Sequence, residues 1–179
     1  MSSQQLVLLA INIIGGVLVI GSYVYGIKSQ SQAASGLWGG ISPGMKNLYF
    51  VSMFFAAVSY FVFTFYILFK LNPAETKIAN IFGFGLFQII YIFMLLPSAA
   101  WMPLSVSMLE NPKSVVWYSI RVVLAIVALA SLALLFALVF ISPKQTSLFY
   151  FSAVAGSAVF FVHTAFLDAL LWPVLFQAK

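Results

Sequence analysis

Long apolar stretches alternate with short polar ones along the whole chain. A helix needs about 20 mostly apolar residues to cross the hydrocarbon layer of a bilayer, and five stretches are long enough. The pattern therefore predicts an all-α integral membrane protein, a bundle of five transmembrane helices whose termini lie on opposite sides. The predicted spans cover residues 6–27, 48–71, 78–96, 115–141 and 148–176.

Two parts of this pattern are irregular. Pro97 and Pro103 follow the third span, and a proline can end or kink a helix. Residues 97–109 are therefore expected either to continue this helix with a kink or to form a separate interfacial segment. The Ser- and Gly-rich residues 29–44 are expected to be flexible or re-entrant. Since neither a repeat nor a soluble domain is visible, residues 1–179 are predicted to form one transmembrane domain.

The polar connections differ between the two predicted sides. Five spans place both long connections, residues 28–47 and 97–114, on the side of the C-terminus. All four tryptophans fall on that side, namely Trp38, Trp101, Trp117 and Trp172. Four lysines flank the spans there, against three on the other side: Lys28, Lys46, Lys113 and Lys179 against Lys70, Lys77 and Lys144. Because positive residues favour the inside, the C-terminal side is expected to be cytoplasmic. The sequence does not indicate which membrane holds the protein.

Composition agrees with a membrane location and excludes several classes of function. The chain is 64% hydrophobic and only 6% charged, whereas soluble domains are about a quarter charged. Its net charge of +5 comes from isolated basic residues, so no basic patch for nucleic acid is present. The absence of cysteine excludes disulfides, thiolate nucleophiles and zinc–thiolate sites. The N-terminal residues lack the positive region of a signal peptide, and the first stretch is interpreted as a retained span.

Arg121 and Asp168 lie well inside the last two predicted spans. At a rise of about 1.5 Å per residue, each is roughly 10 Å from the middle of its span, toward the C-terminal side. A charge inside the bilayer costs about 2.5–3.5 kcal/mol, and pairing offsets this cost. These positions predict an Arg121–Asp168 ion pair, with Tyr118 and Thr164 one turn away to bond the remaining polar atoms. The pair could also act only as a helix clamp, or Arg121 could instead reach the headgroups.

His163 lies close to the middle of the last predicted span. It is five residues from Asp168, about 140° around an α-helix, so these two side chains are not expected to meet. The expected partner is a polar residue of a neighbouring helix, either Gln88 or Asn12. The alternative is a proton relay or a contact to a ligand. With no second histidine and no cysteine, His163 could bind haem only in a dimer, and the cofactor stays unknown.

Recognisable catalytic patterns are missing from the sequence. It has no phosphate-binding loop, nucleophile elbow or HExxH motif. Glu75 and Glu110 fall in connections on opposite sides of the membrane and cannot act together. We therefore predict no catalytic residues and no metal site, and we favour a non-catalytic role while the question of an enzyme stays open.

Two hypotheses for the function remain. In the first, the protein binds or passes a small lipophilic molecule in a cavity on the C-terminal side, lined by the last three helices. Its polar anchors would be Arg121, Asp168 and His163, its wall Trp101, Trp117 and Trp172, with Tyr118 and Thr164 beside them. Pro97 and Pro103 would shape the mouth, and residues 28–47 would cover it.

In the second hypothesis, the chain is an accessory or scaffold subunit of a larger membrane complex, associated with pigment or lipid. Residues 48–71 suit this role, since they are apolar on all sides, and the Arg121–Asp168 pair would then be a structural clamp. The expected partners are the lipid bilayer, a small lipophilic ligand, and a second copy or other membrane subunits, but not nucleic acid. The first hypothesis is preferred because the unusual residues and the long connections gather at one end.

Overall fold

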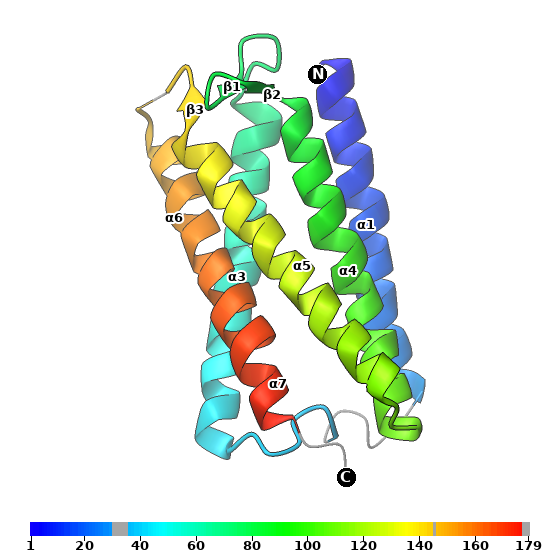
Figure 1. Ribbon diagram of the computed structural model, residues 1–179. Coiled ribbons are helices and arrows are strands. Elements are labelled where there is room, and N and C mark those ends of the chain that lie inside the picture. Colours follow the sequence, from blue (N-terminus) through cyan, green and yellow to red (C-terminus); the bar gives the residue numbers. More distant parts are fainter. Residues whose placement is uncertain (30–35, 145, 177–179) are drawn as a thin grey trace.

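The computed structural model describes residues 1–29, 36–144 and 146–176. Five helices in this part of the chain are long and apolar enough to cross a membrane, which confirms the predicted number. The first four are α1 (Ser3–Ser29), α3 (Pro43–Phe69), α4 (Gly85–Glu110) and α5 (Ser114–Val139). The last begins as α6 (Leu148–Val162), continues as the π-helix η1 (His163–Leu171) and ends as α7 (Trp172–Leu175). The start of α1 and helix α7 lie at opposite ends of the bundle (Figure 1).

The helices form an incomplete ring. Along this ring α1 packs on α4, α4 on α5, α5 on α6 and η1, and α6 on α3. Helices α1 and α3 contact each other at few positions, so the ring is open between them. One hydrophobic core lies around Phe63, Tyr91 and Leu134, and a second around Tyr49 and Trp172.

The start of the third predicted span, residues 78–96, was wrong, because α4 begins only at Gly85. Residues before α4 and directly after α5 form a small antiparallel sheet of order β2-β1-β3, from β1 (Lys77–Ile78), β2 (Phe82–Gly83) and β3 (Ile141–Ser142). The turn between β1 and β2 contains Ala79 and Asn80 with φ of 51° and 59°. The sheet lies near the start of α1 (Figure 1). The sequence did not reveal it, because the apolar residues of the turn and of β2 prolong the hydrophobic run.

The other end of α4 extends without a break to Glu110, so residues 97–109 continue the helix. Pro97 and Pro103 both lie inside it. A proline in a helix frees a carbonyl, and nearby serines can bond such groups inside a membrane bundle. Pro97 frees the carbonyl of Phe93, whereas the Ser98 hydroxyl donates to the next carbonyl along the helix, that of Met94, at 2.7 Å.

Helix α1 approaches α4 closely at two glycines. A Cβ atom on Gly15 would lie 2.7 Å from Cδ1 and 2.8 Å from Cβ of Leu95, and one on Gly26 would collide with Met102. The neighbouring Gly16 is different, because an added Cβ would meet no atom within 4 Å. Gly15 and Gly26 therefore allow α1 to pack closely on α4, whereas the space next to Gly16 is open.

Candidate functional site

A cavity of about 850 Å³ lies between α1 and α3, backed by α4, α5 and the last helix. Its lining is predominantly apolar, and its volume is typical of small-molecule sites. The side chains at its rim are strongly exposed: Ile13 57% and Ile20 67% on α1, Phe50 56% and Phe61 71% on α3. The cavity therefore opens along the flank of the bundle, through the gap in the helix ring.

The cavity is long and is bridged toward the N-terminal end of the bundle. It extends along α1 from Leu9 to Ile27, about 27 Å at the helical rise. Gln5 Nε2 donates to the carbonyl oxygen of Leu68 at 2.8 Å. The hydroxyl of Tyr60 donates to Asn12 Oδ1 at 2.6 Å, which joins α3 to α1 inside the lining. These contacts limit the opening between the two helices toward this end.

Aromatic rings and the segment before α3 close the opposite end. Trp172 Nε1 donates to the carbonyl of Leu37 at 3.2 Å, and Gly40 N–H donates to the carbonyl of Leu175 at 3.2 Å. Leu37 and Trp38 line the cavity here. Part of the segment that was predicted to cover the cavity, residues 28–47, therefore lies at this end of it. Residues 30–35 of that segment lie outside the described residues.

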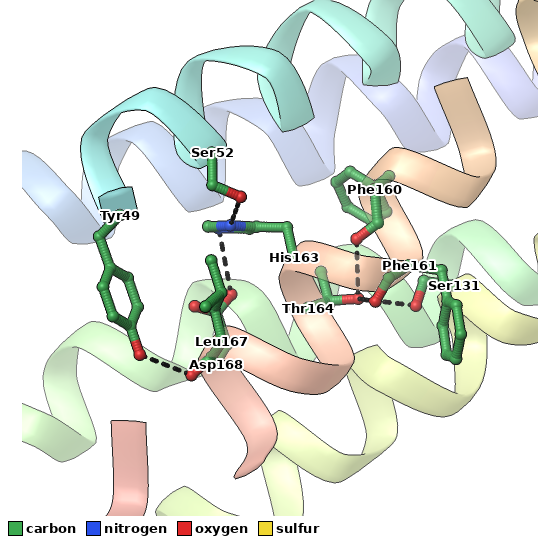
Figure 2. Close-up of polar contacts among 9 residues, drawn as sticks. All are labelled: Tyr49, Ser52, Ser131, Phe160, Phe161, His163, Thr164, Leu167 and Asp168. Carbon is green, nitrogen blue, oxygen red and sulfur yellow. Dashed lines mark hydrogen bonds and ion pairs between the residues drawn. The ribbon is translucent and has the colours of Figure 1, made fainter. Parts of the chain in front are cut away.

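His163 and Asp168 lie next to each other in the last helix (Figure 2), and both line the cavity. His163 Nε2 lies 3.4 Å from Asp168 Oδ2, and His163 Nδ1 is hydrogen-bonded to Ser52 Oγ of α3 at 2.9 Å. Both imidazole nitrogens therefore have partners, one within the last helix and one across to α3. Asp168 keeps 34% of its side-chain surface exposed. Among the described lining residues, it is the only aspartate, glutamate, lysine or arginine.

The π-helix explains why His163 and Asp168 meet, against the prediction. Hydrogen bonds in a π-helix join residues five apart, as the bond from Trp172 N–H to the carbonyl of Leu167 shows. Residues at i and i+5 are then about one turn apart on the same face. Short π segments occur frequently at functional sites. The hydroxyl of Tyr49 also donates to the Leu167 carbonyl at 2.7 Å (Figure 2).

The predicted Arg121–Asp168 ion pair was wrong. Arg121 is exposed, and neither it nor Asp168, both described, forms an ion pair with the other. The inner face of α5 is formed instead by Ile120, Leu124 and Val127. Depth in the membrane was estimated from the sequence, but the rotation of α5 about its axis was not.

The other predicted site residues divide between the cavity and the outside. Trp101, Trp172 and Pro97 line the cavity, whereas Trp117 stacks on Phe176 beside a shallow surface depression. Thr164 also lines it, with Oγ1 2.7 Å from Ser131 Oγ of α5 (Figure 2). Outside the described lining lie Tyr118, which is 63% exposed, and Pro103. The predicted partners of His163 bond elsewhere: Asn12 to Tyr60, and Gln88 to the carbonyl of Gln4.

Helices α1 and α3 supply much of the lining, although the cavity was expected between the last three helices. Sequence reasoning missed Tyr23, Tyr49 and Ser52 for this reason. A polar residue every few turns along an apolar helix is the signal that could have found them. It is weak, because serine and tyrosine often bond within their own helix or at the interface.

The arrangement can hold a long apolar molecule and contact one polar group on it. The described residues contain no cluster of three metal-ligating side chains. Comparison with protein-family models, with curated proteins and with solved structures gave no match. The cavity and the His163–Asp168 pair are therefore the features of this chain that bear on its function.

Proposed function

We propose that the protein is an integral membrane protein that binds a small lipophilic molecule in the cavity between α1 and α3. The observation that carries this proposal is the 850 Å³ apolar cavity, which opens along the flank of helices long enough to span a membrane. In a bilayer this flank would face the acyl chains. A lipophilic molecule would then exchange between the cavity and the membrane without crossing water.

The polar groups of the cavity support a ligand site over a structural clamp. Binding sites for small molecules are mostly apolar, with few polar groups that orient the ligand. Ionisable residues inside membrane helices commonly mark ligand or proton pathways. A clamp would be packed without open space, whereas the carboxyl group of Asp168 is partly exposed beside the cavity. This difference favours ligand binding over the accessory-subunit hypothesis.

A pair of matched glycine variants tests the proposal. Gly16 and Gly21 both lie in α1, and a Cβ at either position meets no atom within 4 Å. Gly16 lines the cavity, and Gly21 is not among its described lining residues. Native mass spectrometry of the protein gently extracted in nanodiscs should reveal a bound molecule in the wild type and in Gly21→Phe, but not in Gly16→Phe. Equal occupancy in the two variants, or no bound molecule in any of the three proteins, would contradict the proposal.

We further propose that the end of the bundle carrying α7 is cytoplasmic, from the four-to-three distribution of lysines in the sequence. The absence of cysteine allows single-cysteine labelling without background. In intact cells, an impermeant maleimide should label Glu75→Cys and spare Lys113→Cys. The opposite pattern would reverse the orientation.

A further inference from the structure

Charge inside the cavity has one sign. The chain carries a net charge of +5, yet the described lining of the cavity contains one aspartate and no lysine or arginine. The His163–Asp168 distance of 3.4 Å exceeds the usual length of a charge-assisted hydrogen bond, about 2.7–2.9 Å. A carboxylate has roughly four acceptor positions. Asp168 therefore retains the capacity to bind a donor on a ligand.

Aromatic rings line the same end of the cavity as Asp168. The ring of Trp101 lies 5.8 Å from that of Tyr23 and 5.6 Å from that of Trp172, measured between centroids. Tyr23 and Tyr49 line the cavity together with Asp168, and the Tyr49 hydroxyl bonds the carbonyl of Leu167, the residue before Asp168. Faces of aromatic rings attract ammonium groups, most strongly where water is excluded. A carboxylate among such rings is suited to an organic cation and unsuited to an anion.

Polar side chains elsewhere in the cavity are already satisfied by one another. The hydroxyl of Tyr60 bonds Asn12 at 2.6 Å, and Thr64 bonds the hydroxyl of Tyr91 at 2.7 Å. Thr164 bonds Ser131 at 2.7 Å. Free hydrogen-bonding capacity is thus concentrated near Asp168, where the Tyr23 hydroxyl also has no partner among the described residues. The remainder of the cavity offers apolar surface to a ligand.

We infer that the ligand is a lipophilic amine, whose protonated nitrogen binds the Asp168 carboxylate beside the rings of Tyr23 and Trp101. Its hydrocarbon part lies between α1 and α3 toward Asn12. This inference rests on the proposed function and adds the chemical class of the ligand. Fatty acids and other anionic lipophiles are expected to bind more weakly, because the described lining contains the Asp168 carboxyl group and no lysine or arginine that could neutralise them.

Three probes with the same tail test this inference: dodecylamine, dodecanol and dodecanoic acid. Each is titrated into the full-length protein in phosphatidylcholine nanodiscs, and the quenching or shift of tryptophan fluorescence is recorded with native mass spectrometry beside it. Gly16→Phe protein in the same nanodiscs corrects for partition into lipid. We expect dodecylamine to bind at least ten times more tightly than dodecanol, about 1.4 kcal/mol, and dodecanoic acid to bind most weakly. Asp168→Asn should remove the preference for the amine.

The outcomes separate this inference from the proposed function. If all three probes bind the wild type equally and Gly16→Phe blocks them all, the cavity binds lipophiles and the amine assignment is overturned. Tighter binding of the acid than of the amine overturns it as well. If no probe binds saturably, both the inference and the proposed function fail. The comparison of probes in the wild type does not depend on the folding of Asp168→Asn.

Discussion

His163 and Asp168 are five residues apart, and their side chains nevertheless meet, with Nε2 and Oδ2 separated by 3.4 Å. The pairing depends on η1, because residues five apart in an α-helix point about 140° away from each other. Ser52 of α3 bonds the other ring nitrogen at 2.9 Å and fixes the imidazole between two helices. The π segment thus brings a carboxylate and an imidazole to the same cavity surface.

A double-mutant cycle tests this pairing. His163→Gln and Asp168→Asn should be non-additive in the free energy of unfolding, with a coupling of about 1 kcal/mol, as expected for residues in contact. The matched control is the cycle between Arg121→Gln and Asp168→Asn, which should be additive because Arg121 is exposed and not paired with Asp168. Unfolding is followed by circular dichroism in a detergent series. Coupling to Arg121 instead of His163 would contradict the observed site.

Comparison of Arg121 with Asp168 shows how far the sequence could predict this site. Their depths follow from the helical rise, and the five long helices follow from hydrophobic length. The rotation of α5 about its axis does not follow, because apolar residues occur on every side of this helix and do not identify an inner face. Packing decides it, placing Ile120 at 0% exposure and leaving Arg121 outside. Only tertiary contacts could have excluded the predicted pair.

Local backbone geometry is the second feature that could not be predicted from the sequence. Nothing in the residues from His163 to Leu171 indicates a π-helix, so an α-helical period was assumed and the His163–Asp168 contact was missed. Before α4, apolar residues such as Ile78 and Phe82 belong to strands of a small sheet, although their hydrophobicity is also compatible with a helix. Hydrophobic length identified the spans, but hydrogen bonding decided where regular α-helix begins and ends.

The adjacent glycines of α1 should differ in their tolerance of alanine. A Cβ on Gly15 would lie 2.7 Å from Leu95, so Gly15→Ala should destabilise the protein by about 1–3 kcal/mol through overpacking. Gly16→Ala meets no atom within 4 Å and should be neutral or stabilising by up to about 1 kcal/mol, from helix propensity. Thermal unfolding of the two variants in the same detergent measures the difference. Equal effects would contradict the close packing of α1 on α4 at this position.

The buried hydroxyl contact between α5 and η1 should contribute measurably to stability. Ser131 Oγ and Thr164 Oγ1 are 2.7 Å apart, and both residues are buried. Hydrogen bonds between membrane helices average about 0.6 kcal/mol, with a maximum near 1.7 kcal/mol. Ser131→Ala should therefore lower the free energy of unfolding by an amount in this range.

Ser119→Ala is the matched control in the same helix, because Ser119 bonds only the carbonyl of Val115, within α5. It should change stability by much less than Ser131→Ala. A steric-trap or detergent-unfolding assay resolves differences of this size. Equal losses in both variants would indicate that the Ser131–Thr164 contact adds nothing beyond local helix effects.

The hydrogen bond between Tyr60 and Asn12 should control how quickly a ligand leaves the cavity. It is one of the few links between α1 and α3, at 2.6 Å, and it lies within the cavity lining. Tyr60→Phe removes this link and keeps the aromatic ring. A hydrogen bond contributes about 1 kcal/mol, and lowering the barrier to ligand exit by this amount should make dissociation of bound dodecylamine roughly fivefold faster. Stopped-flow dilution with tryptophan fluorescence measures this rate.

Tyr25→Phe is the control, because Tyr25 lies on α1 with 55% exposure and is not among the described lining residues. An unchanged rate in Tyr60→Phe would mean that the ligand does not leave through the gap between α1 and α3.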